Sequence, residues 1–315
     1  MLKPRLHKAI VWTFNVILAI FVVPIALLVT TIITNIESCR RKEEKSIKNE
    51  VAVVTGSATG LGKHLAIALA ARGCHVAICD INFDLAVTTA QEIADKYGVK
   101  TKAYKVDVSK YDEIVELNKK LTDDIGAATI LVNNAGLMLH ADRLNPTVEE
   151  IQTMINVNYT SHFWTNRVFK ENMRRAEKGY IMAICSIAGL HVMVENEPYS
   201  STKFAVRTLM RALRALLKIE GLHYIHLTTV FPIFIATSSK LIQLSIDEGF
   251  GKIYPLLKSE EVAQRAVSGM LRGEVEVIIP SYIALTYRLY VLFPQRVQDW
   301  INAFYVRRSK KYKKI

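Results

Sequence analysis

Short apolar runs alternate with amphipathic stretches from residue 50 to residue 280, and this alternation constrains the fold more than any other feature. The apolar runs have the length of buried strands, and the amphipathic stretches have the length of helices. Such alternation predicts a single α/β domain with a doubly wound parallel sheet covered on both faces. The predicted strands are 51–55, 75–80, 101–106, 129–132, 180–185, 224–230 and 275–279; the predicted helices are one ending near 71, then 84–97, 112–125, 147–175, 199–220 and 259–271.

An uncharged apolar segment precedes this body. Residues 9–36 hold no charged side chain over 28 positions. A helix of that length extends about 42 Å, against a hydrocarbon core of roughly 30 Å. The segment is too long for a cleavable signal peptide and no small-residue cleavage site follows it, so we expect a retained membrane-anchor helix. Pro24 leaves a re-entrant hairpin as an alternative, and the flanking Lys and Arg residues favour a cytosolic body.

The net charge of +12 is concentrated at the two ends of the chain. Residues 1–48 carry +5 and residues 307–315 carry +6, so residues 49–306 carry only +1. Nucleic-acid-binding domains carry their basic surface on the folded body, so we expect no nucleic acid as partner and expect membrane lipids instead. The chain divides into an anchor over 1–39, a basic linker over 40–49, the folded body over 50–280, and an apolar segment with a basic tail over 281–315.

A glycine-rich turn, Thr55-Gly56-Ser57-Ala58-Thr59-Gly60-Leu61-Gly62, joins the first predicted strand to the first helix. Glycines let the backbone approach a pyrophosphate, and the following helix N-terminus offers N–H groups to its negative charge. Asp80 ends the second strand, where an acid binds the adenosine ribose and repels a 2′-phosphate. No basic residue follows Asp80 directly, which predicts a Rossmann-type site for NAD rather than NADP. The alternative is that Asp80 only caps its strand.

The G-x-x-x-G-x-G spacing of this turn resembles that of the short-chain dehydrogenase/reductase family, and the resemblance covers most of residues 50–280. Asn133-Asn134-Ala135-Gly136 is similar to the family's Asn-Asn-Ala-Gly, and Asp107 to the acid that borders the adenine pocket. The resemblance implies that 50–280 is a dinucleotide-binding catalytic domain. Its expected cofactor-binding residues are Thr55, Gly56, Ser57, Thr59, Gly60, Leu61, Gly62, Asp80, Asp107, Asn134, Ala135, Gly136, Tyr199, Lys203, Pro232 and Thr237.

The catalytic residues expected from the same resemblance are Tyr199, Lys203, Ser186 and Asn158. Tyr199 and Lys203 form the family's Tyr-x-x-x-Lys, and positions four apart share one helix face, so the ammonium lies beside the phenol. Tyr199 can then act as general base toward an alcohol or general acid toward a carbonyl. Ser186, at a strand end 13 residues earlier, holds the substrate oxygen, and Asn158 organises a water near the lysine.

Two features depart from the family pattern. Ile233 follows Pro232 where the family often has glycine, which puts the cofactor geometry there in doubt, although Thr237 still stands five residues after Pro232. Glu195-Asn196-Glu197 is unusually polar for a site that handles apolar substrates. The four cysteines and eight histidines show no metal-ligand spacing, so no metal is expected.

The expected substrate is a lipophilic alcohol or carbonyl compound. Residues 238–258, where the family places its substrate loop, are rich in Leu, Ile, Phe and Tyr. An anchor joined to this domain resembles the membrane-bound retinol and 17β-hydroxysteroid dehydrogenase branch, found on endoplasmic reticulum and lipid droplets, with the catalytic domain facing the cytosol. Residues 311–315 resemble a K-x-K-x-x retrieval signal, a pattern short enough to arise by chance.

Two other functions remain open from the sequence. One is a membrane or lipid-droplet scaffold that keeps the fold without useful turnover, which Ile233 favours and the intact Ser186, Tyr199 and Lys203 oppose. The other is an NADPH-dependent carbonyl reductase, which Asp80 opposes. The family resemblance further implies a homodimer through the helices around 147–175 and 199–220.

Overall fold

The computed structural model describes residues 3–26, 28–30, 43–138, 146–193, 196–236 and 256–308. The chain forms two compact units, Met1–Glu43 and Glu44–Ile315. Thr237, the expected substrate loop except its last residues, Cys39 and the K-x-K-x-x pattern lie outside the described residues.

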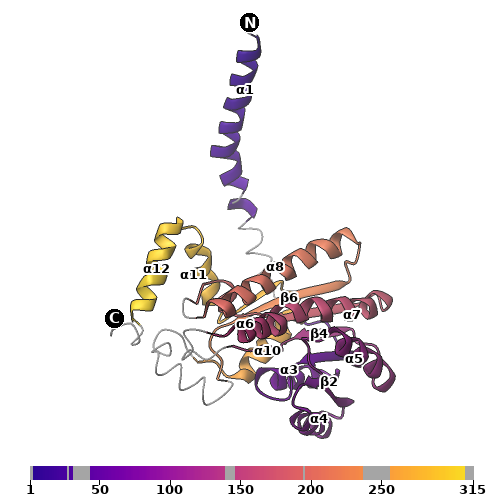
Figure 1. Ribbon diagram of the computed structural model, residues 1–315. Helices are drawn as coiled ribbons and strands as arrows, with labels where there is room; N and C mark the ends of the chain where they lie inside the picture. Colours follow the sequence, from indigo (N-terminus) through magenta and orange to yellow (C-terminus); the bar gives the residue numbers. More distant parts are fainter. Residues whose placement is uncertain are drawn as a thin grey trace. The chain divides into compact units, whose positions relative to one another are not determined.

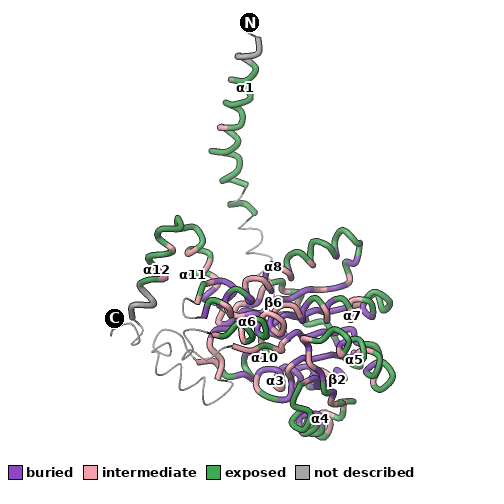
Figure 2. The backbone as a smooth tube through the Cα atoms, in the orientation of Figure 1, coloured by how far each residue is buried: buried purple, intermediate pink, exposed green. Residues whose placement is uncertain are grey.

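The N-terminal unit is a single helical rod over its described residues. Helix α1 (Lys3–Ile17) continues into a π-helical turn, η1 (Leu18–Val22), and helical backbone persists through Pro24. Residues 10–30 are long and apolar enough to cross a membrane, and all but one of the described residues among them are exposed (Figure 2). The helix therefore has the properties expected of a membrane anchor and shows no turn at Pro24.

The second unit is built on a seven-stranded sheet in which every strand pairs in parallel with its neighbour (Figure 1). The strand order is β3-β2-β1-β4-β5-β6-β7. The strands are β1 (Val51–Thr55), β2 (His75–Asp80), β3 (Thr101–Lys105), β4 (Ile130–Asn133), β5 (Gly179–Ile184), β6 (Ile225–Pro232) and β7 (Glu276–Ile279). All seven predicted strands are present, with ends that differ by one or two residues.

Helices cover both faces of the sheet, as predicted. One buried cluster joins the sheet to α3, α4 and α10, and a second joins its other face to α5, α7 and α8. Ala52 and Val54 face the first cluster, whereas Val51 and Val53 face the second, because side chains alternate along a strand. The helices are α3 (Gly60–Ala70), α4 (Phe83–Tyr97), α5 (Tyr111–Asp124), α6 (Val148–Ile155), α7 (Ser161–Arg175), α8 (Glu197–Ile219), α10 (Ser259–Leu271), α11 (Tyr282–Tyr290) and α12 (Gln295–Arg308).

Local capping explains where several of these helices begin and end. Asn82 accepts a hydrogen bond from the backbone N–H of Leu85 at the start of α4, and Gly98 ends that helix in the left-handed conformation, with φ at 64°. Thr147 and Glu150 form a reciprocal capping box at the start of α6. The continuous helix predicted over 147–175 is wrong in one respect, since a π-helical turn, η2 (Asn156–Thr160), separates α6 from α7.

The strand order creates a crevice outside the carboxyl ends of β1 and β4, which are neighbours in the sheet. From β1 the chain proceeds to β2 and β3 on one side, and from β4 it proceeds to β5, β6 and β7 on the other. At such a reversal the loops leaving the carboxyl ends of the two central strands diverge, and the gap between them is the usual ligand site of a doubly wound sheet. The glycine turn after β1 and residues 134–136 after β4 therefore meet at this crevice.

Candidate active site

The glycine turn after β1 has a backbone that side chains would obstruct. Gly56 has φ at 63°, and a Cβ there would lie 2.8 Å from the Cα of Ala135. A Cβ at Gly62 would overlap the carbonyl oxygen of Gly56. The turn leads directly into α3, whose first N–H groups lack partners within the helix. Close approach and free N–H groups are what a pyrophosphate needs.

Asn134 and Thr55 hold this turn against the end of β4. The Asn134 side-chain amide donates to the carbonyl oxygens of Thr55 and Gly56, both at 2.9 Å. In return, the Thr55 hydroxyl oxygen accepts from the backbone N–H groups of Asn134 at 3.1 Å and Ala135 at 3.0 Å. These two residues therefore shape the cofactor turn through hydrogen bonds of the fold.

Ser57 also serves the fold. Its buried hydroxyl donates to the carbonyl of Val54 at 2.7 Å and accepts from the backbone N–H of Cys79 at 3.0 Å. Its backbone N–H donates to the Cys79 carbonyl at 3.2 Å. Ser57 thus ties the turn to β2, while Thr59 stands at the start of α3 without a side-chain capping bond.

The two predicted acids lie at the carboxyl ends of neighbouring strands. Asp80 ends β2, where its carboxylate accepts from the backbone N–H groups of Ala58 and Asn82, both at 3.0 Å. Asp107 follows β3 and accepts from the backbone N–H of Ser109 at 3.0 Å and from its hydroxyl at 2.7 Å. Asp80 therefore caps its strand end and also reaches the glycine turn, so the two interpretations of this residue are compatible.

Ser186, Tyr199 and Lys203 line one cleft at the carboxyl ends of β4, β5 and β6. Ser186 follows β5, and its hydroxyl oxygen accepts from the backbone N–H of Ala188 at 3.1 Å. Tyr199 and Lys203 lie one turn apart on α8, with the Lys203 Nζ 5.5 Å from the centre of the Tyr199 ring. Lys203 is buried and donates to the carbonyl of Ile184 at 3.1 Å. Folding brings together three residues that the sequence separates by up to 17 positions.

Asn158 lies behind this cleft, on the π-helical turn η2. Its side-chain oxygen accepts from the backbone N–H of Leu137 at 2.8 Å, and its amide donates to the Leu137 carbonyl at 2.7 Å and to the Thr202 hydroxyl at 3.3 Å. Its Oδ1 would lie 3.4 Å, and the Lys203 Nζ 3.7 Å, from a Cβ built at Gly136. Asn158 therefore joins the loop after β4 to α8. π-Helical turns frequently occur at functional sites.

The cleft is about 260 Å³ in volume and its wall is mainly apolar. Four of the residues expected to bind cofactor, Leu61, Asn134, Gly136 and Pro232, line it. Ile233, and Leu256 of the expected substrate loop, also line it, and the structure adds apolar residues that the sequence did not single out: Leu137, Met138, Ile184, Ile187, Met193, Phe234 and Ile235. Only the folded chain places these segments opposite one another.

Comparison with known proteins identifies the family. The family model for short-chain dehydrogenases matches residues 50–242. The chain belongs to the short-chain dehydrogenase/reductase family. It is 31% identical over 297 residues to human 17-beta-hydroxysteroid dehydrogenase 13, covering 91% of this chain and 94% of that protein. It is 32% identical over 260 residues to human estradiol 17-beta-dehydrogenase 11, covering 81% and 83% of the two chains.

A solved structure shows the same fold. A short-chain dehydrogenase/reductase from Burkholderia phymatum, crystallised in complex with NAD, superposes with a TM-score of 0.68 at 20% identity, over 78% of this chain and 94% of that one. The protein is thus an NAD(P)-dependent short-chain dehydrogenase/reductase. Its own residues fit that cofactor, because the glycine turn leads into the unpaired N–H groups at the start of α3 and Asp80 reaches the turn from the end of β2.

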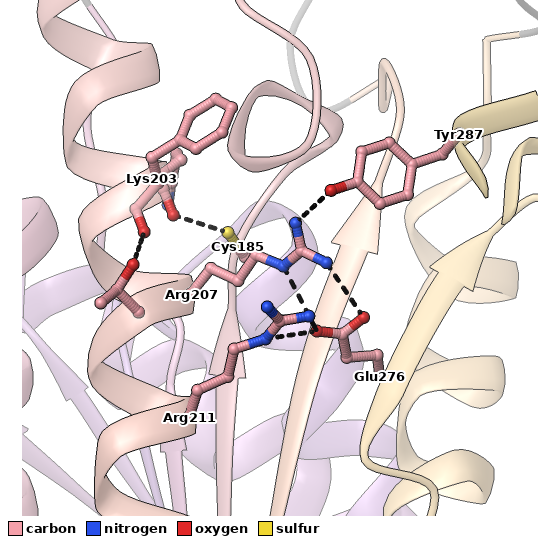
Figure 3. Close-up of polar contacts among 8 residues, drawn as sticks. Cys185, Lys203, Arg207, Arg211, Glu276 and Tyr287 are labelled. Atoms are coloured by element: carbon pink, nitrogen blue, oxygen red, sulfur yellow. Dashed lines mark hydrogen bonds and ion pairs between the residues drawn. The ribbon is translucent and has the colours of Figure 1, made fainter. Parts of the chain in front are cut away.

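In this short-chain dehydrogenase/reductase, a charged cluster connects α8 to the end of the sheet and to α11 (Figure 3). Arg207, one turn beyond Lys203, contacts both carboxylate oxygens of Glu276 on β7 at 3.3 and 3.4 Å and donates to the Tyr287 hydroxyl at 2.6 Å. Burial raises the pKa of the Cys185 thiol to about 11, so it stays protonated and donates to the Lys203 carbonyl at 3.2 Å. These contacts connect α8 to β5, β7 and α11.

His162 is buried on α7 and has an unusual titration. Burial, with a smaller contribution from the nearby Lys203 ammonium, lowers its pKa from 6.5 to about 3. Its Nδ1 has no hydrogen-bond partner within the described part of the chain. The imidazole is therefore neutral in the folded protein, whereas the unfolded chain takes up a proton below about pH 6.5.

We expect His162→Gln to flatten the dependence of stability on pH. The stability associated with neutral His162 is fully present above about pH 6.5. It is lost as the pH falls toward 3, by up to about 1.4 kcal/mol per pH unit, because only the unfolded chain binds the proton in this range. Urea unfolding of the wild type and of His162→Gln at several values between about pH 5 and pH 7 gives the slope of unfolding free energy against pH for each protein. This range is chosen because the histidine of the unfolded chain titrates within it. His223→Gln, outside the core, is the control, and identical slopes for wild type and His162→Gln would contradict the expectation.

Proposed function

We propose that this protein is a membrane-anchored oxidoreductase that transfers a hydride between NAD(H) and a lipophilic alcohol/carbonyl pair, namely a retinoid, a steroid or a long-chain lipid. The observation that carries the proposal is the cleft itself, where Ser186, Tyr199 and Lys203 face a mainly apolar wall beside the glycine turn. Apolar walls with a few convergent polar groups are typical of sites for lipophilic small molecules.

Each polar residue has a separate task in this reaction. When bound, NAD(H) supplies or accepts the hydride. The Ser186 hydroxyl oxygen already accepts from Ala188, so its own O–H can donate to the substrate oxygen. Tyr199 takes the proton from an alcohol or gives it to a carbonyl at that oxygen. The Lys203 ammonium stabilises negative charge on the Tyr199 oxygen, and Asn158 positions the Leu137 loop beside them.

The preference for NAD(H) rests on Asp80. Its carboxylate stands at the end of β2 beside the glycine turn, where it repels a 2′-phosphate and accepts from ribose hydroxyls. We expect Asp80→Asn to raise the ratio of kcat/KM for NADP(H) over NAD(H) by about tenfold, since hydrogen bonds to charged groups contribute about 1.5–3 kcal/mol. Asp84→Asn, which removes an exposed acid four residues later, is the matched control. An unchanged ratio in Asp80→Asn would remove Asp80 from cofactor selection.

The apolar N-terminal helix supports the location of this protein at a membrane. We propose that residues 1–39 anchor the chain in the endoplasmic reticulum membrane or on lipid droplets, that 40–49 are a basic linker, and that the catalytic domain over 50–280 faces the cytosol. The basic residues on both sides of the helix support this orientation weakly. We further propose a homodimer through the helices around 147–175 and 199–220, that is α6, α7 and α8, as the family resemblance implies.

Turnover by the full-length chain in membranes tests the proposed function. Retinol, retinal, steroids and long-chain alcohols are offered with NAD(H) or NADP(H), and cofactor reduction or oxidation is measured. We expect turnover of at least one lipophilic pair, with NAD(H) preferred. Absence of turnover with every substrate would contradict the enzyme proposal and favour a scaffold, whereas NADPH-dependent reduction alone would favour a carbonyl reductase.

A further inference from the structure

The C-terminal hairpin, defined here as α11, the connecting residues 291–294 and α12, is apolar on two sides. On α11, Ile283, Tyr287 and Tyr290 face the body of the protein. The opposite side carries exposed large apolar side chains at helical spacing, Tyr282, Leu285, Leu289 and Leu292, with Leu285 64% and Leu292 78% exposed. A helix at a water-facing surface normally places polar residues on its outer side, so this outer face needs an apolar partner.

The apolar surface continues around the tip of the hairpin and onto α12. Val291, Leu292 and Phe293 are three consecutive exposed apolar residues, and Trp300 on α12 is 66% exposed. Three exposed apolar residues in a row are rare on soluble proteins unless they have a function. Tyrosine and tryptophan are the residues enriched where protein meets the interface of a bilayer.

The net charge of the C-terminal segment favours a membrane over a second copy of the chain as the partner of this face. Residues 281–315 contain eight Lys and Arg residues and one acid, Asp299. An exposed apolar face in a segment whose sequence carries this net positive charge matches a bilayer with anionic headgroups. A second copy of the same surface would instead bring two strongly positive segments together, which opposes association.

We propose that the C-terminal hairpin docks on an anionic membrane surface, with its outer apolar face in the headgroup region, as a membrane contact separate from the N-terminal helix. The helix over 10–30 tethers the body to a bilayer through residues 31–42, so the hairpin meets a membrane at high effective concentration. Interfacial helices of this kind lie in the plane of the bilayer and do not cross it.

The inner face of the hairpin connects this docking to the catalytic cleft. The Tyr287 hydroxyl accepts from Arg207 of the catalytic helix (Figure 3), and the rings of Tyr287 and Tyr290 lie 5.3 and 4.6 Å from that of His191. His191 belongs to the segment between Ser186 and Met193, both of which line the cleft. Docking of the hairpin would therefore hold the substrate side of the cleft close to the lipid in which a lipophilic substrate dissolves. This last step rests on the proposed function.

Fluorescence of Trp300 in the full-length chain tests the docking. The chain has three tryptophans, and Trp12→Phe with Trp164→Phe leaves Trp300 alone. This protein is reconstituted in vesicles of phosphatidylcholine and phosphatidylserine. We expect lipids with brominated acyl chains to quench Trp300, and aqueous acrylamide to quench it weakly. Quenching by acrylamide without quenching by the lipids would overturn the proposal, and so would shielding from both together with a dimeric mass in cross-linking.

Charge-introducing variants separate docking from anchoring. Leu285→Glu with Leu292→Glu should expose Trp300 to acrylamide and abolish its quenching by brominated lipid, while the N-terminal helix keeps the protein in the vesicles. Val87→Glu with Val115→Glu places the same two charges on exposed apolar residues of α4 and α5 and should leave both readouts unchanged. Equal quenching in the hairpin variant and the wild type would also overturn the proposal.

Kinetics distinguish failure of docking from failure of the proposed chemistry. In the hairpin variant we expect KM for a vesicle-dissolved substrate to rise by at least about threefold, with kcat/KM for a water-soluble alcohol unchanged. Trp300 quenching requires no turnover, so an inactive protein that still docks contradicts only the proposed function. An unchanged KM despite lost quenching would limit the hairpin to membrane contact without substrate supply.

Discussion

Tyr199→Phe should lower kcat by about a thousandfold, because it removes only the oxygen that exchanges a proton with the substrate. The ring stays in place beside Lys203, whose Nζ lies 5.5 Å from its centre, so the cleft keeps its shape. The measurement is the rate of cofactor reduction by the full-length protein with saturating alcohol and NAD. Cofactor affinity, measured by fluorescence titration, should change little.

Tyr111→Phe is the matched control for this experiment. Tyr111 lies on α5 and packs edge-on against Trp164, away from the cleft-lining residues, so its loss should leave kcat unchanged. If Tyr199→Phe retained the wild-type rate, proton transfer by Tyr199 would be excluded. The Tyr-x-x-x-Lys pair would then have only a structural role on α8.

Glu276→Ala should cost about 3 kcal/mol of unfolding free energy, because it leaves a buried guanidinium without its carboxylate. Glu276 contacts both Arg207, whose side chain is 11% exposed, and Arg211, whose side chain is 63% exposed. Tyr287 and the Phe231 ring remain beside Arg207 but carry no negative charge to replace the carboxylate. Urea unfolding of the detergent-solubilised protein measures the loss.

Arg211→Ala tests whether burial causes that loss. It removes the exposed partner of the same carboxylate, at 3.0 Å, and should cost less than about 1 kcal/mol, as exposed ion pairs do. Glu276→Gln, which keeps an acceptor without the charge, should fall between the two substitutions. Equal losses for Glu276→Ala and Arg211→Ala would contradict the assignment of the energy to buried Arg207.

Prediction from the sequence worked best where local pattern and backbone chemistry coincide. The glycine turn could be placed because tight backbone approach requires glycine, and the seven strands because their apolar runs are short and bounded by turns. The η2 turn could not be placed, since Asn156–Thr160 contains no glycine or proline that would mark a break between α6 and α7. One extra residue in a helical turn leaves no signature in composition.

The two roles of Ser57 and Asp80 show a second limit. A serine or an acid beside a glycine turn suggests cofactor contact, but the Ser57 hydroxyl already donates to Val54 and accepts from Cys79. Asp80 both caps β2 and binds Ala58 of the turn. Which oxygen faces a ligand depends on the backbone that surrounds it in space, and residues distant in sequence supply that backbone.

The sequence by itself determined the α/β class, the order of the strands along the chain and the apolar N-terminal helix. It also singled out Ser186, Tyr199 and Lys203 as candidate polar residues of one site. These follow from periodicity, from spacing within one helix, and from motifs confined to a few residues. The tertiary structure decided what lies opposite those residues: the apolar wall from Leu137 to Leu256, the support of α8 by Glu276, and the outward apolar face of α11. Each of these depends on contacts between segments far apart in the chain, which only the packed sheet and its helices bring within reach.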